Sequence, residues 1–417
     1  MILKLYRGLS YLLYPAIVLL LRKRLKQGKE HPERKNERRG YNVVPRPKTK
    51  LIWIHGASVG ECLSTMPLIT RLAKMPNTMV MVTSGTVTSA EVMARRLPKE
   101  GAFHQFVPVD YPTFTRRFVQ HFHPDVAIFI ESDFWPNLLM DTHKAGIPLI
   151  LLNGRISDRS FKSWQRLPFF IKPLLRLFTL TLGQTEEDAR RLRVLGSQRA
   201  LSVGNIKFAA TVSPFDENEL TQMRNAIGSR FCWVAGSTHD NEEEQEADIH
   251  LKIKAIYPDI LTIMAPRHPE RADAIEKMLN AKGLTVHRRS RKEDVNADVY
   301  IADTVGDMGL VYRLAPLVFV GGSLVAFGGQ NMLEPMQAGA CTFIGPHAFN
   351  FREIVVRAKK ACALIEVQNK DELAEQLLSM HDNNKIRQQI AQKGQDFAFS
   401  ETAVLDRVCD VLKEWIQ

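Results

Sequence analysis

Short apolar runs alternate with amphipathic stretches along the chain from Leu51 onward. The apolar runs in the first half predict strands at 51–56, 79–84, 103–109, 126–131, 148–153, 180–184 and 200–205. Helical periodicity between these runs predicts helices at 61–74, 86–97, 112–122, 136–145 and 185–195. Because the apolar runs are continuous rather than alternating, we expect both faces of each strand to be buried, as in a parallel sheet covered by helices.

A second series of apolar runs in the other half predicts strands at 231–237, 260–266, 299–303, 317–323, 341–346 and 362–367. The polar stretch 206–229 between the two series contains Ser213-Pro214 and is typical of a linker. The pattern therefore predicts an α/β protein with two doubly wound, Rossmann-like domains, at 51–205 and 230–400, that face a central cleft. The last helix, within 401–417, has one apolar side that suits packing across the other domain.

The first 21 residues are a different kind of segment, with an uncharged run from Gly8 to Leu21 behind Lys4 and Arg7. This run is shorter than the roughly 20 apolar residues that a helix needs to span a bilayer. A tilted span, a helix lying in the membrane interface and a buried core helix all fit its composition. We expect residues 1–21 to be a membrane anchor, followed by a basic juxtamembrane segment at 22–50 that keeps the body on the cytoplasmic side.

The charge of the chain is concentrated at this end. The whole sequence has 56 Lys and Arg and 45 Asp and Glu, and residues 1–50 alone contain 14 basic and 3 acidic residues. This surplus equals the formal net charge of +11 for the whole chain, so the rest is neutral overall. A nucleic-acid-binding protein would spread its basic face over the folded body. The distribution therefore favours an anionic membrane surface as the partner and argues against nucleic acid.

Cysteine and histidine positions indicate neither a disulfide framework nor a metal site. The five cysteines are scattered without a CxxC pair, which suits a reducing compartment. The sequence has no HExxH motif and no His/Cys cluster with metal-ligand spacing. We therefore expect a protein that uses neither a metal nor a cofactor.

The motif HGASVGE at 55–61 stands where the first predicted strand turns into a helix. Ser58 and Gly60 let the backbone close against a ligand, and Glu61 opens the helix, where a carboxylate facing the cleft can act as a general base. A structural interpretation carries about equal weight. The glycines can simply tighten the turn, Ser58 can be an N-cap, and Glu61 can complement the helix dipole.

Two further candidates come from the same half of the chain. In ESDFWPN, Glu131 and Asp133 lie at the end of a buried strand and could point into the cleft together with Glu61. Capping of the following helix is the alternative. Lys207, in VGNIKFA before the predicted linker, could stabilise a leaving phosphate. A single lysine is more often a surface charge.

The second half offers groups that suit an anion. In PRHPER, Arg267 can hold a phosphate or carboxylate in a bidentate manner and His268 can donate one more hydrogen bond. The proline that follows starts a helix whose N-terminal amides favour anions. An ordinary polar loop is the alternative.

A glycine-rich stretch, GGSLVAFGGQNMLEP at 321–335, follows another predicted strand. Gly322 and Ser323 permit close backbone approach to a ligand, and Glu334 could bind a pair of ribose hydroxyls. The stretch is neither a Walker loop nor a GxGxxG fingerprint. GDMG at 306–309 opens a further helix with backbone amides that could also bind an anion.

In this order, HGASVGE, ESDFWPN, PRHPER, GGS…GGQNMLEP and GPHAFNF resemble the lipid A Kdo transferases, which are 3-deoxy-D-manno-octulosonic acid transferases of the GT-B fold. The resemblance covers nearly the whole chain. It implies a glycosyltransferase of lipopolysaccharide biosynthesis at the cytoplasmic face of the inner membrane. The implied donor is CMP-Kdo, the acceptor is the lipid A precursor lipid IVA, and the anomeric configuration is inverted.

The resemblance also implies roles for individual residues. Glu61 would be the base, and Glu131 and Lys207 would assist the transition state. The implied contacts to CMP come from Arg267, His268, Met308, Gly309, Leu310, Asn331, Met332, Leu333 and Glu334. Two positions depart from the family pattern. Leu310 replaces a common glutamate, which puts its part in donor binding in doubt, and Asp133 is a shorter second acid.

Two other classes of protein compete with this interpretation. A nucleotide-sugar epimerase also uses two similar domains, but it needs neither an anchor nor a lipid acceptor. A non-catalytic membrane receptor for a nucleotide sugar needs neither the candidate acids nor the lysine. Release of CMP from CMP-Kdo, with and without the lipid, separates the three.

Overall fold

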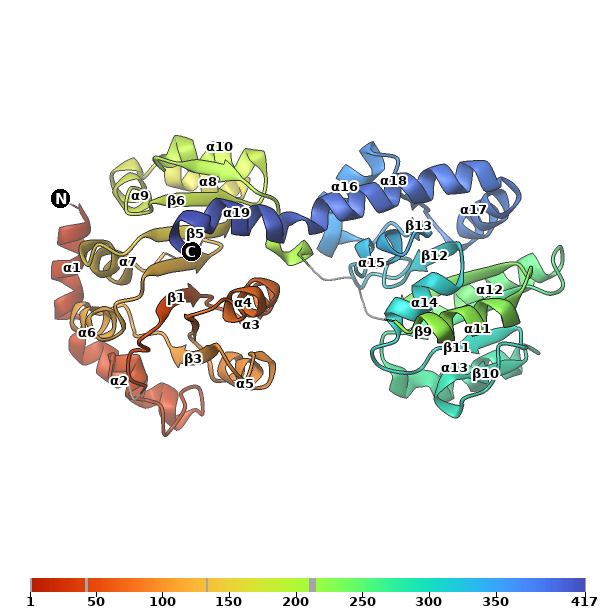
Figure 1. Ribbon diagram of the computed structural model, residues 1–417, viewed down its shortest axis with the longest axis horizontal. Coiled ribbons are helices and arrows are strands. Elements are labelled where there is room, and N and C mark those ends of the chain that lie inside the picture. Colours follow the sequence, from red (N-terminus) through yellow and green to blue (C-terminus); the bar gives the residue numbers. More distant parts are fainter. Residues whose placement is uncertain (1, 42–43, 133, 210–214, 417) are drawn as a thin grey trace. The chain divides into compact units, whose positions relative to one another are not determined.

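The computed structural model describes residues 2–41, 44–132, 134–209 and 215–416. The chain divides into two compact units (Figure 1). Unit 1 comprises Met1–Ala210 and Glu401–Gln417, and unit 2 comprises Thr211–Ser400. Asp133, one of the candidate acids, lies outside the described residues.

Unit 1 is built on a seven-stranded parallel sheet. Its strands are β1 (Lys50–His55), β2 (Thr78–Ser84), β3 (Ala102–Phe106), β4 (Val126–Ile130), β5 (Leu149–Gly154), β6 (Leu180–Gly183) and β7 (Ala200–Ser202). They lie in the order β3-β2-β1-β4-β5-β6-β7, and Ile52 of β1 pairs in register with Val126 of β4. Buried side chains on both faces of this sheet form two apolar cores, as the continuous apolar runs predict.

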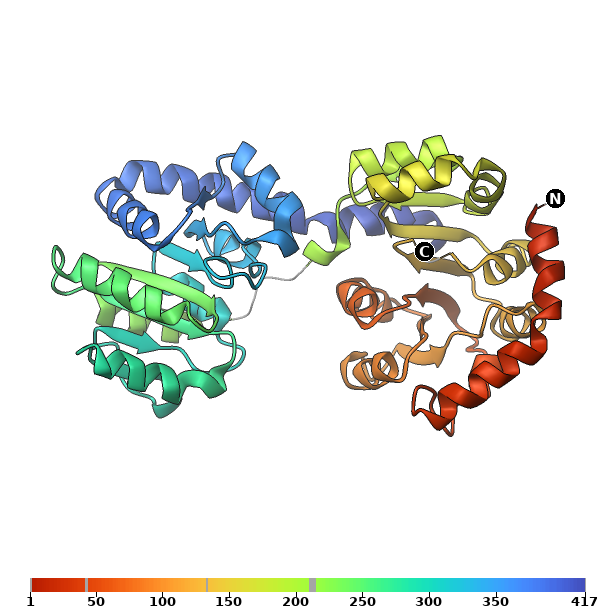
Figure 2. The ribbon, with the colours of Figure 1, turned by 180° about the vertical axis from the view of Figure 1, so that it is seen from behind.

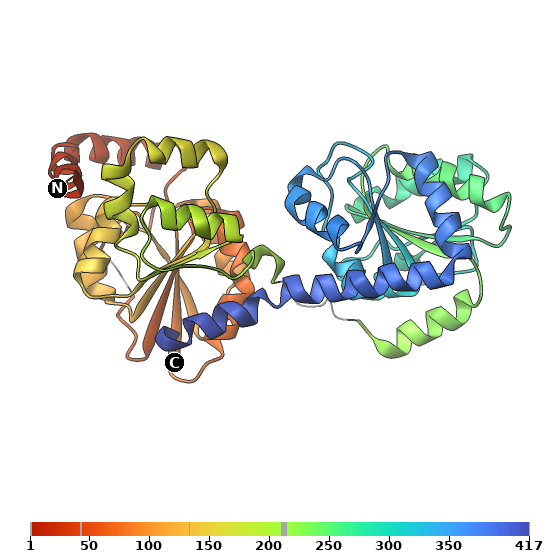
Figure 3. The same ribbon diagram turned by 90° about the horizontal axis from the view of Figure 1, so that it is seen from above.

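The helices of unit 1 cover both faces of the sheet (Figure 3). They are α3 (Val59–Ser64), α4 (Met66–Ala73), α5 (Val87–Arg96), α6 (Pro112–Phe122), α7 (Pro136–Lys144), α8 (Asp158–Gln165), α9 (Pro168–Leu175) and α10 (Glu186–Leu195), with a short 3-10 turn η2 (Ile206–Phe208). The helix predicted at 61–74 is two helices that meet at Thr65, because Pro67 lacks an N–H for a continuous helix and stands in the first turn of α4.

Unit 2 repeats the arrangement with a second seven-stranded parallel sheet. Its strands are β8 (Cys232–Thr238), β9 (Leu261–Pro266), β10 (Val286–Arg288), β11 (Val299–Ile301), β12 (Leu317–Val320), β13 (Cys341–Ile344) and β14 (Ile365–Glu366). They lie in the order β10-β11-β9-β8-β12-β13-β14. The helices are α11 (Glu217–Ile227), α12 (Glu243–Lys254), α13 (Ala272–Ala281), α14 (Met308–Leu314), α15 (Leu333–Gln337), α16 (Arg352–Lys360), α17 (Lys370–Asp382) and α18 (Asn384–Thr402).

The segment 206–229, expected to be a linker, contains a helix. α11 buries Leu220 and Ile227 and packs against α14 of unit 2. Its remaining surface is polar, which gives the stretch the composition of a linker. After α18 the chain returns to unit 1 as α19 (Val404–Ile416), whose buried Val408 and Leu412 join an apolar core of that unit (Figure 3).

The N-terminal segment forms two helices on one side of unit 1 (Figure 2), α1 (Ile2–Leu12) and α2 (Tyr14–Lys26), and a 3-10 turn η1 (Glu37–Arg39) follows them. Within the described part of the chain, no single helix is both long and apolar enough to cross a membrane. The α1–α2 pair meets that test only when taken together, and it is bent by 63°.

One side of α1 belongs to the fold of unit 1. Leu3 is buried in a core, the Tyr6 hydroxyl donates to Asp110 Oδ2 at 3.1 Å, and Arg7 lies 2.7 Å from Asp141. Leu12 on the same helix is 75% exposed. The segment thus combines the packing of a core helix with an exposed apolar side.

Candidate functional site

Each sheet has one point where the strand order reverses, between β1 and β4 in unit 1 and between β8 and β12 in unit 2. Ligands of open α/β sheets bind beyond the carboxyl ends of the strands at such a point. Glu61 follows β1, Glu131 follows β4, and Gly322 follows β12. The topology therefore gathers the candidate residues of each unit at the edge of the sheet where a ligand is expected.

Glu61 is held in a reciprocal capping arrangement at the start of α3. Its Oε2 accepts the Ala57 N–H at 2.8 Å and its Oε1 accepts the Ser58 hydroxyl at 2.9 Å, while the Glu61 N–H donates to Ser58 Oγ at 3.2 Å. The arrangement is a variant of the capping box, in which the N-cap Ser58 accepts from the Glu61 N–H and Glu61 accepts the N–H of Ala57, the residue before the N-cap. Ser58 therefore caps the helix, which is the structural role that the sequence left open, and its contacts fix the orientation of the Glu61 carboxylate. Ser58 and Gly60 are exposed.

Glu131 and Lys207 form an ion pair, with Lys207 Nζ 2.7 Å from Glu131 Oε1. Their side chains are 26% and 45% exposed, so both can reach a bound ligand. Glu131 has a φ of 61°, in the left-handed region that non-glycine residues rarely adopt. Strained backbone of this kind costs about 1–3 kcal/mol and clusters at functional sites.

Local contacts bring the turn that contains Lys207 against the helix that contains Glu61. Lys207 lies in η2, where its N–H donates to Asn205 Oδ1 at 3.0 Å, and η2 contacts α3. The preceding Ile206 N–H donates at 3.0 Å to Oδ1 of Asn153, another residue with a φ of 61° at a strand end. Asn153 was not among the expected site residues, and its one signal is that it is a polar residue at the end of the apolar run LILLN.

In unit 2, Arg267 and His268 follow β9 and are exposed. The His268 ring lies 6.2 Å from that of His239, which follows β8 and is buried. The His239 ring stacks on Phe327 at 4.4 Å and its Nε2 lies 3.0 Å from Gln330 Nε2. Burial lowers the pKa of His239, and the nearby His268 lowers it further. These rings and Arg267 form a cationic and aromatic edge that suits an anion carrying a flat base.

The glycine-rich loop is organised by a residue that the sequence analysis missed. Glu242, which is fully buried, accepts the N–H groups of Gly322 at 2.6 Å, Ser323 at 3.1 Å and Leu324 at 3.0 Å. It also accepts the N–H of His239 at 3.1 Å. The amides of Gly322 and Ser323, expected to face the donor, therefore already have an acceptor, and their loop is held by a carboxylate.

Burial raises the pKa of Glu242, and the four N–H donors act against that shift. A further acid, Glu246, has no hydrogen-bond partner among the described residues at either carboxylate oxygen, and burial raises its pKa well above the usual value. Both residues belong to the acidic run NEEEQE, whose composition is typical of a solvated helix face. Composition alone could not distinguish these inward-facing members of the run.

The remaining expected donor contacts differ in what they can offer. Asn331 lies just before the N-cap of α15, with its Oδ1 accepting the Leu333 N–H at 3.1 Å and its Nδ2 donating to Glu334 Oε1 at 3.0 Å. Leu310, Met332 and Leu333 have buried side chains, so only their backbone could face a ligand. Gly309 is buried as well, and Met308 is half-buried.

No group of three or more His, Cys, Asp or Glu side chains that could hold a metal ion occurs among the described residues. The cationic groups near the two switch points are Lys207 in unit 1 and Arg267 in unit 2.

Comparison with known proteins gives consistent matches. The family model described as 3-Deoxy-D-manno-octulosonic-acid transferase (kdotransferase) matches residues 28–210. A 3-deoxy-D-manno-octulosonic acid transferase of Rickettsia bellii is 34% identical over 92% of this chain and 92% of its own length. One from Haemophilus influenzae is 28% identical over 99% of this chain and 98% of its own length.

Among solved structures, UDP-GlcNAc 2-epimerase from Neisseria meningitidis bound to UDP-GlcNAc superposes with a TM-score of 0.56. The match covers 87% of this chain and 99% of that one at 13% identity. At this identity the likeness concerns the fold alone, two parallel-sheet α/β domains in one chain.

Proposed function

Because the chain belongs to the family of 3-deoxy-D-manno-octulosonic acid transferases, and so is a glycosyltransferase, we propose that it moves Kdo from CMP-Kdo to the lipid A precursor lipid IVA and releases CMP. The observation that carries this proposal is the grouping of Glu61, Glu131 and Lys207 beyond β1 and β4. The fold likeness to an epimerase does not favour the competing class, because it rests on 13% identity, whereas the transferases match at 34%.

In the proposed reaction, the acceptor hydroxyl attacks the anomeric carbon of Kdo from the face opposite CMP. A bond forms between that oxygen and the anomeric carbon, the bond from the carbon to the phosphate oxygen of CMP breaks, and the configuration inverts. Glu61 takes the hydroxyl proton. The acceptor hydroxyl then takes the place of the Ser58 hydroxyl on Glu61 Oε1, so the capping geometry prepares the carboxylate for this hydrogen bond.

The Glu131–Lys207 pair acts on the charge that develops during the step. A lysine near the breaking bond stabilises the negative phosphate, and Glu131 holds the ammonium group in one position. In unit 2, Arg267 and His268 hold the phosphate of CMP, and Asn331 with Glu334 positions the nucleoside. The reaction as proposed needs no metal ion, so activity survives exhaustive treatment with EDTA. Loss of activity that magnesium restores would overturn this part.

We also propose that the protein works at the cytoplasmic face of the inner membrane. Exposed leucines gather on the N-terminal helices, with more than half of the surface of Leu5, Leu9, Leu12, Leu13, Leu19 and Leu20 accessible. Such an apolar side, next to a basic segment, suits a helix pair lying in the interface of an anionic bilayer.

The test is a single incubation of the purified protein with CMP-Kdo and detergent-dispersed lipid IVA. The proposal predicts CMP release that depends on the lipid, with a Kdo-bearing lipid as the second product. Conversion of a nucleotide sugar without the lipid would favour the epimerase class, and binding without turnover would favour the receptor class.

A further inference from the structure

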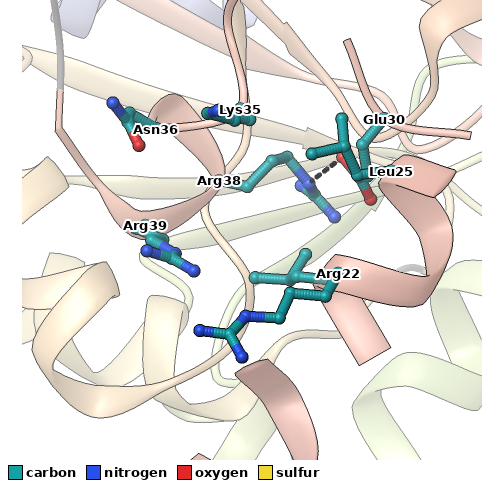
Figure 4. Close-up of a pocket in the computed structure, with 8 residues that line it drawn as sticks. Arg22, Leu25, Glu30, Lys35, Asn36, Arg38 and Arg39 are labelled. Carbon is teal, nitrogen blue, oxygen red and sulfur yellow. Dashed lines mark ion pairs between the residues drawn. The ribbon is translucent and has the colours of Figure 1, made fainter. Parts of the chain in front are cut away.

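A basic pocket of about 220 Å³ lies in the N-terminal region of unit 1 (Figure 4), and none of the three candidate catalytic residues lines it. Four of its eight lining residues are cationic, namely Arg22, Lys35, Arg38 and Arg39. They come from α2, from η1 and from the residues just before η1, so two stretches of the basic N-terminal segment fold together around one hollow.

The only acid that lines this pocket, Glu30, is already shared by two arginines. It is buried, with its Oε1 2.6 Å from Arg24 Nε and its Oε2 3.3 Å from Arg38 Nε. Among the described residues, no carboxylate lies within ion-pair distance of Arg22, Lys35 or Arg39. The pocket therefore has a surplus of positive charge.

Arg38 is the most confined of these cations. It also donates to the carbonyl of Val107, and burial lowers its pKa, with the charge of Arg24 adding to the effect. Holding an arginine in such surroundings costs free energy unless an anion compensates the charge. A bound phosphate would supply that compensation, because guanidinium groups match its oxygens in a bidentate manner.

A second pocket adjoins the first and shares Leu21, Glu30 and Arg38 with it. This neighbour has a volume of about 370 Å³ and a largely apolar lining that includes Ile17, Leu20 and Trp135. At its other end it reaches Ala57, whose N–H donates to Glu61. A continuous path thus leads from four cations, past apolar side chains of α2, to the loop that holds the candidate base.

We propose that the basic pocket binds a phosphate group of the acylated, phosphorylated saccharide that accepts the sugar, and that the adjoining apolar pocket receives one of its acyl chains. This inference rests on the proposed function for the identity of the acceptor. It makes α2 and the η1 segment part of the acceptor site. Phosphate affinity and apolar volume side by side match a phosphorylated lipid, whereas free phosphate would use only one of the two pockets.

The test uses the full-length protein in neutral detergent, so that no anionic surface contributes. The variant R22Q/K35Q removes two exposed cations of the basic pocket. We expect the KM for the lipid acceptor to rise about tenfold or more, with kcat and the KM for CMP-Kdo little changed. K23Q/K26Q removes the same charge from α2 at positions that line neither pocket. We expect a much smaller rise there, and an equal rise in both variants would overturn the pocket by showing a general field effect.

A dephosphorylated acceptor completes a double-mutant cycle. Wild type should bind it about tenfold more weakly than the phosphorylated form, and R22Q/K35Q, which keeps only Arg38 and Arg39, should show a much smaller difference between the two forms. Equal losses from dephosphorylation in both proteins would overturn the proposal. The proposal would also be overturned if R22Q/K35Q weakened only the binding of phosphatidylglycerol vesicles. That result would show that the pocket binds the phosphate of bilayer lipids rather than that of the acceptor.

A direct binding assay separates this inference from the proposed function. Trp135 lines the apolar pocket, so binding of the phosphorylated lipid should change tryptophan fluorescence without any turnover. Phosphate-dependent binding that R22Q/K35Q weakens, in a protein that releases no CMP, would support the pocket and refute the transferase reaction. Turnover that does not depend on the acceptor phosphate would support the transferase reaction and refute the phosphate pocket. Inorganic phosphate that displaces the lipid completely would show that the apolar pocket contributes nothing.

Discussion

The two units share one topology and use their carboxylates in opposite ways. In unit 1, Glu61 and Glu131 stand at the switch point within reach of solvent, one in a capping box and the other paired with Lys207. In unit 2, Glu242 occupies the corresponding region but is fully buried and accepts four backbone N–H groups. An acid at a switch point is therefore not a catalytic candidate by position alone. Its exposure decides whether it serves a ligand or the loop around it.

The comparison extends to what each unit offers a substrate. Unit 1 combines exposed leucines, a basic pocket and carboxylates, which suits a lipid with a reactive hydroxyl. Unit 2 offers Arg267 and His268 beside stacked rings, which suits a nucleotide. Of the acids that follow β8, Glu242 and Glu246 are turned inward, away from a bound nucleotide.

The largest expected effect concerns Glu61, one of the two solvent-accessible acids of unit 1. Glu61→Gln should lower turnover about 10²–10⁴-fold, because an amide cannot take the acceptor proton. Glutamine also fits a capping box, so the free energy of unfolding should stay near that of wild type. Turnover and urea unfolding measure the two outcomes, and CMP binding serves as the control for the donor site. Turnover close to wild type would remove Glu61 from the mechanism.

A matched pair of substitutions tests whether the buried acid Glu242 and the partly exposed acid Glu131 have different roles. Glu242→Gln should lower the free energy of unfolding by about 3 kcal/mol, because one amide oxygen cannot accept the N–H groups that a buried carboxylate accepts. Glu131→Gln should change stability by less than about 1 kcal/mol, since its ion pair is partly exposed, yet lower turnover. Chemical denaturation and CMP release measure both. Equal stability losses would show that burial does not distinguish the two acids.

Most of the sheet framework could be predicted from the sequence, because buried parallel strands leave continuous apolar runs. The short strand β10 was missed for a physical reason. Its Arg288 is charged and pairs with Asp303 at 2.7 Å, so no apolar run marks the strand. The helices α8 and α9 were also missed. α8 is only eight residues long, and Phe161 and Trp164, its apolar residues, pack against the core while only partly buried, so its apolar signal is short.

The candidate residues of the site can be read from local motifs, whereas the long-range contacts around them cannot. Glu61, Glu131 and Lys207 each follow a readable strand-end pattern, and the structure places them on neighbouring elements. Glu242 looked like part of a solvated acidic helix, because its partners lie some 80 residues further along the chain. In the same way, Tyr6 binds Asp110 across 104 positions, so the sequence could not show that α1 belongs to unit 1.

A third prediction concerns which unit binds the membrane through its exposed apolar side chains. Leu12→Gln, at the end of α1, should weaken binding to anionic vesicles about tenfold, since burial of a leucine side chain contributes ~1.5–3 kcal/mol. Ile256→Gln is the matched control in unit 2, where the side chain is 59% exposed. It should leave vesicle binding unchanged. Vesicle flotation measures both, and equal losses would contradict an assignment of the membrane contact to unit 1.

The last expected effect, gradual rather than a single step, concerns the buried acids of unit 2 and their dependence on pH. Burial, reinforced by Glu242 and Glu243, raises the pKa of Glu246 well above that of an unfolded glutamate. The folded state therefore holds a proton that the unfolded state loses near pH 4.5, so this group favours folding at lower pH and opposes it as the pH rises towards its folded pKa. Each pH unit in that window should lower the free energy of unfolding of the wild type by about 1.4 kcal/mol.

Glu246→Gln has the same shape but does not titrate. The difference in free energy of unfolding between this variant and wild type should therefore change, in favour of the variant, by that amount for each pH unit. Urea unfolding at pH 5, 6 and 7 measures the slope. Glu375→Gln on the exposed side of α17 is the control, and a slope there equal to that of Glu246→Gln would contradict the assignment to a buried acid.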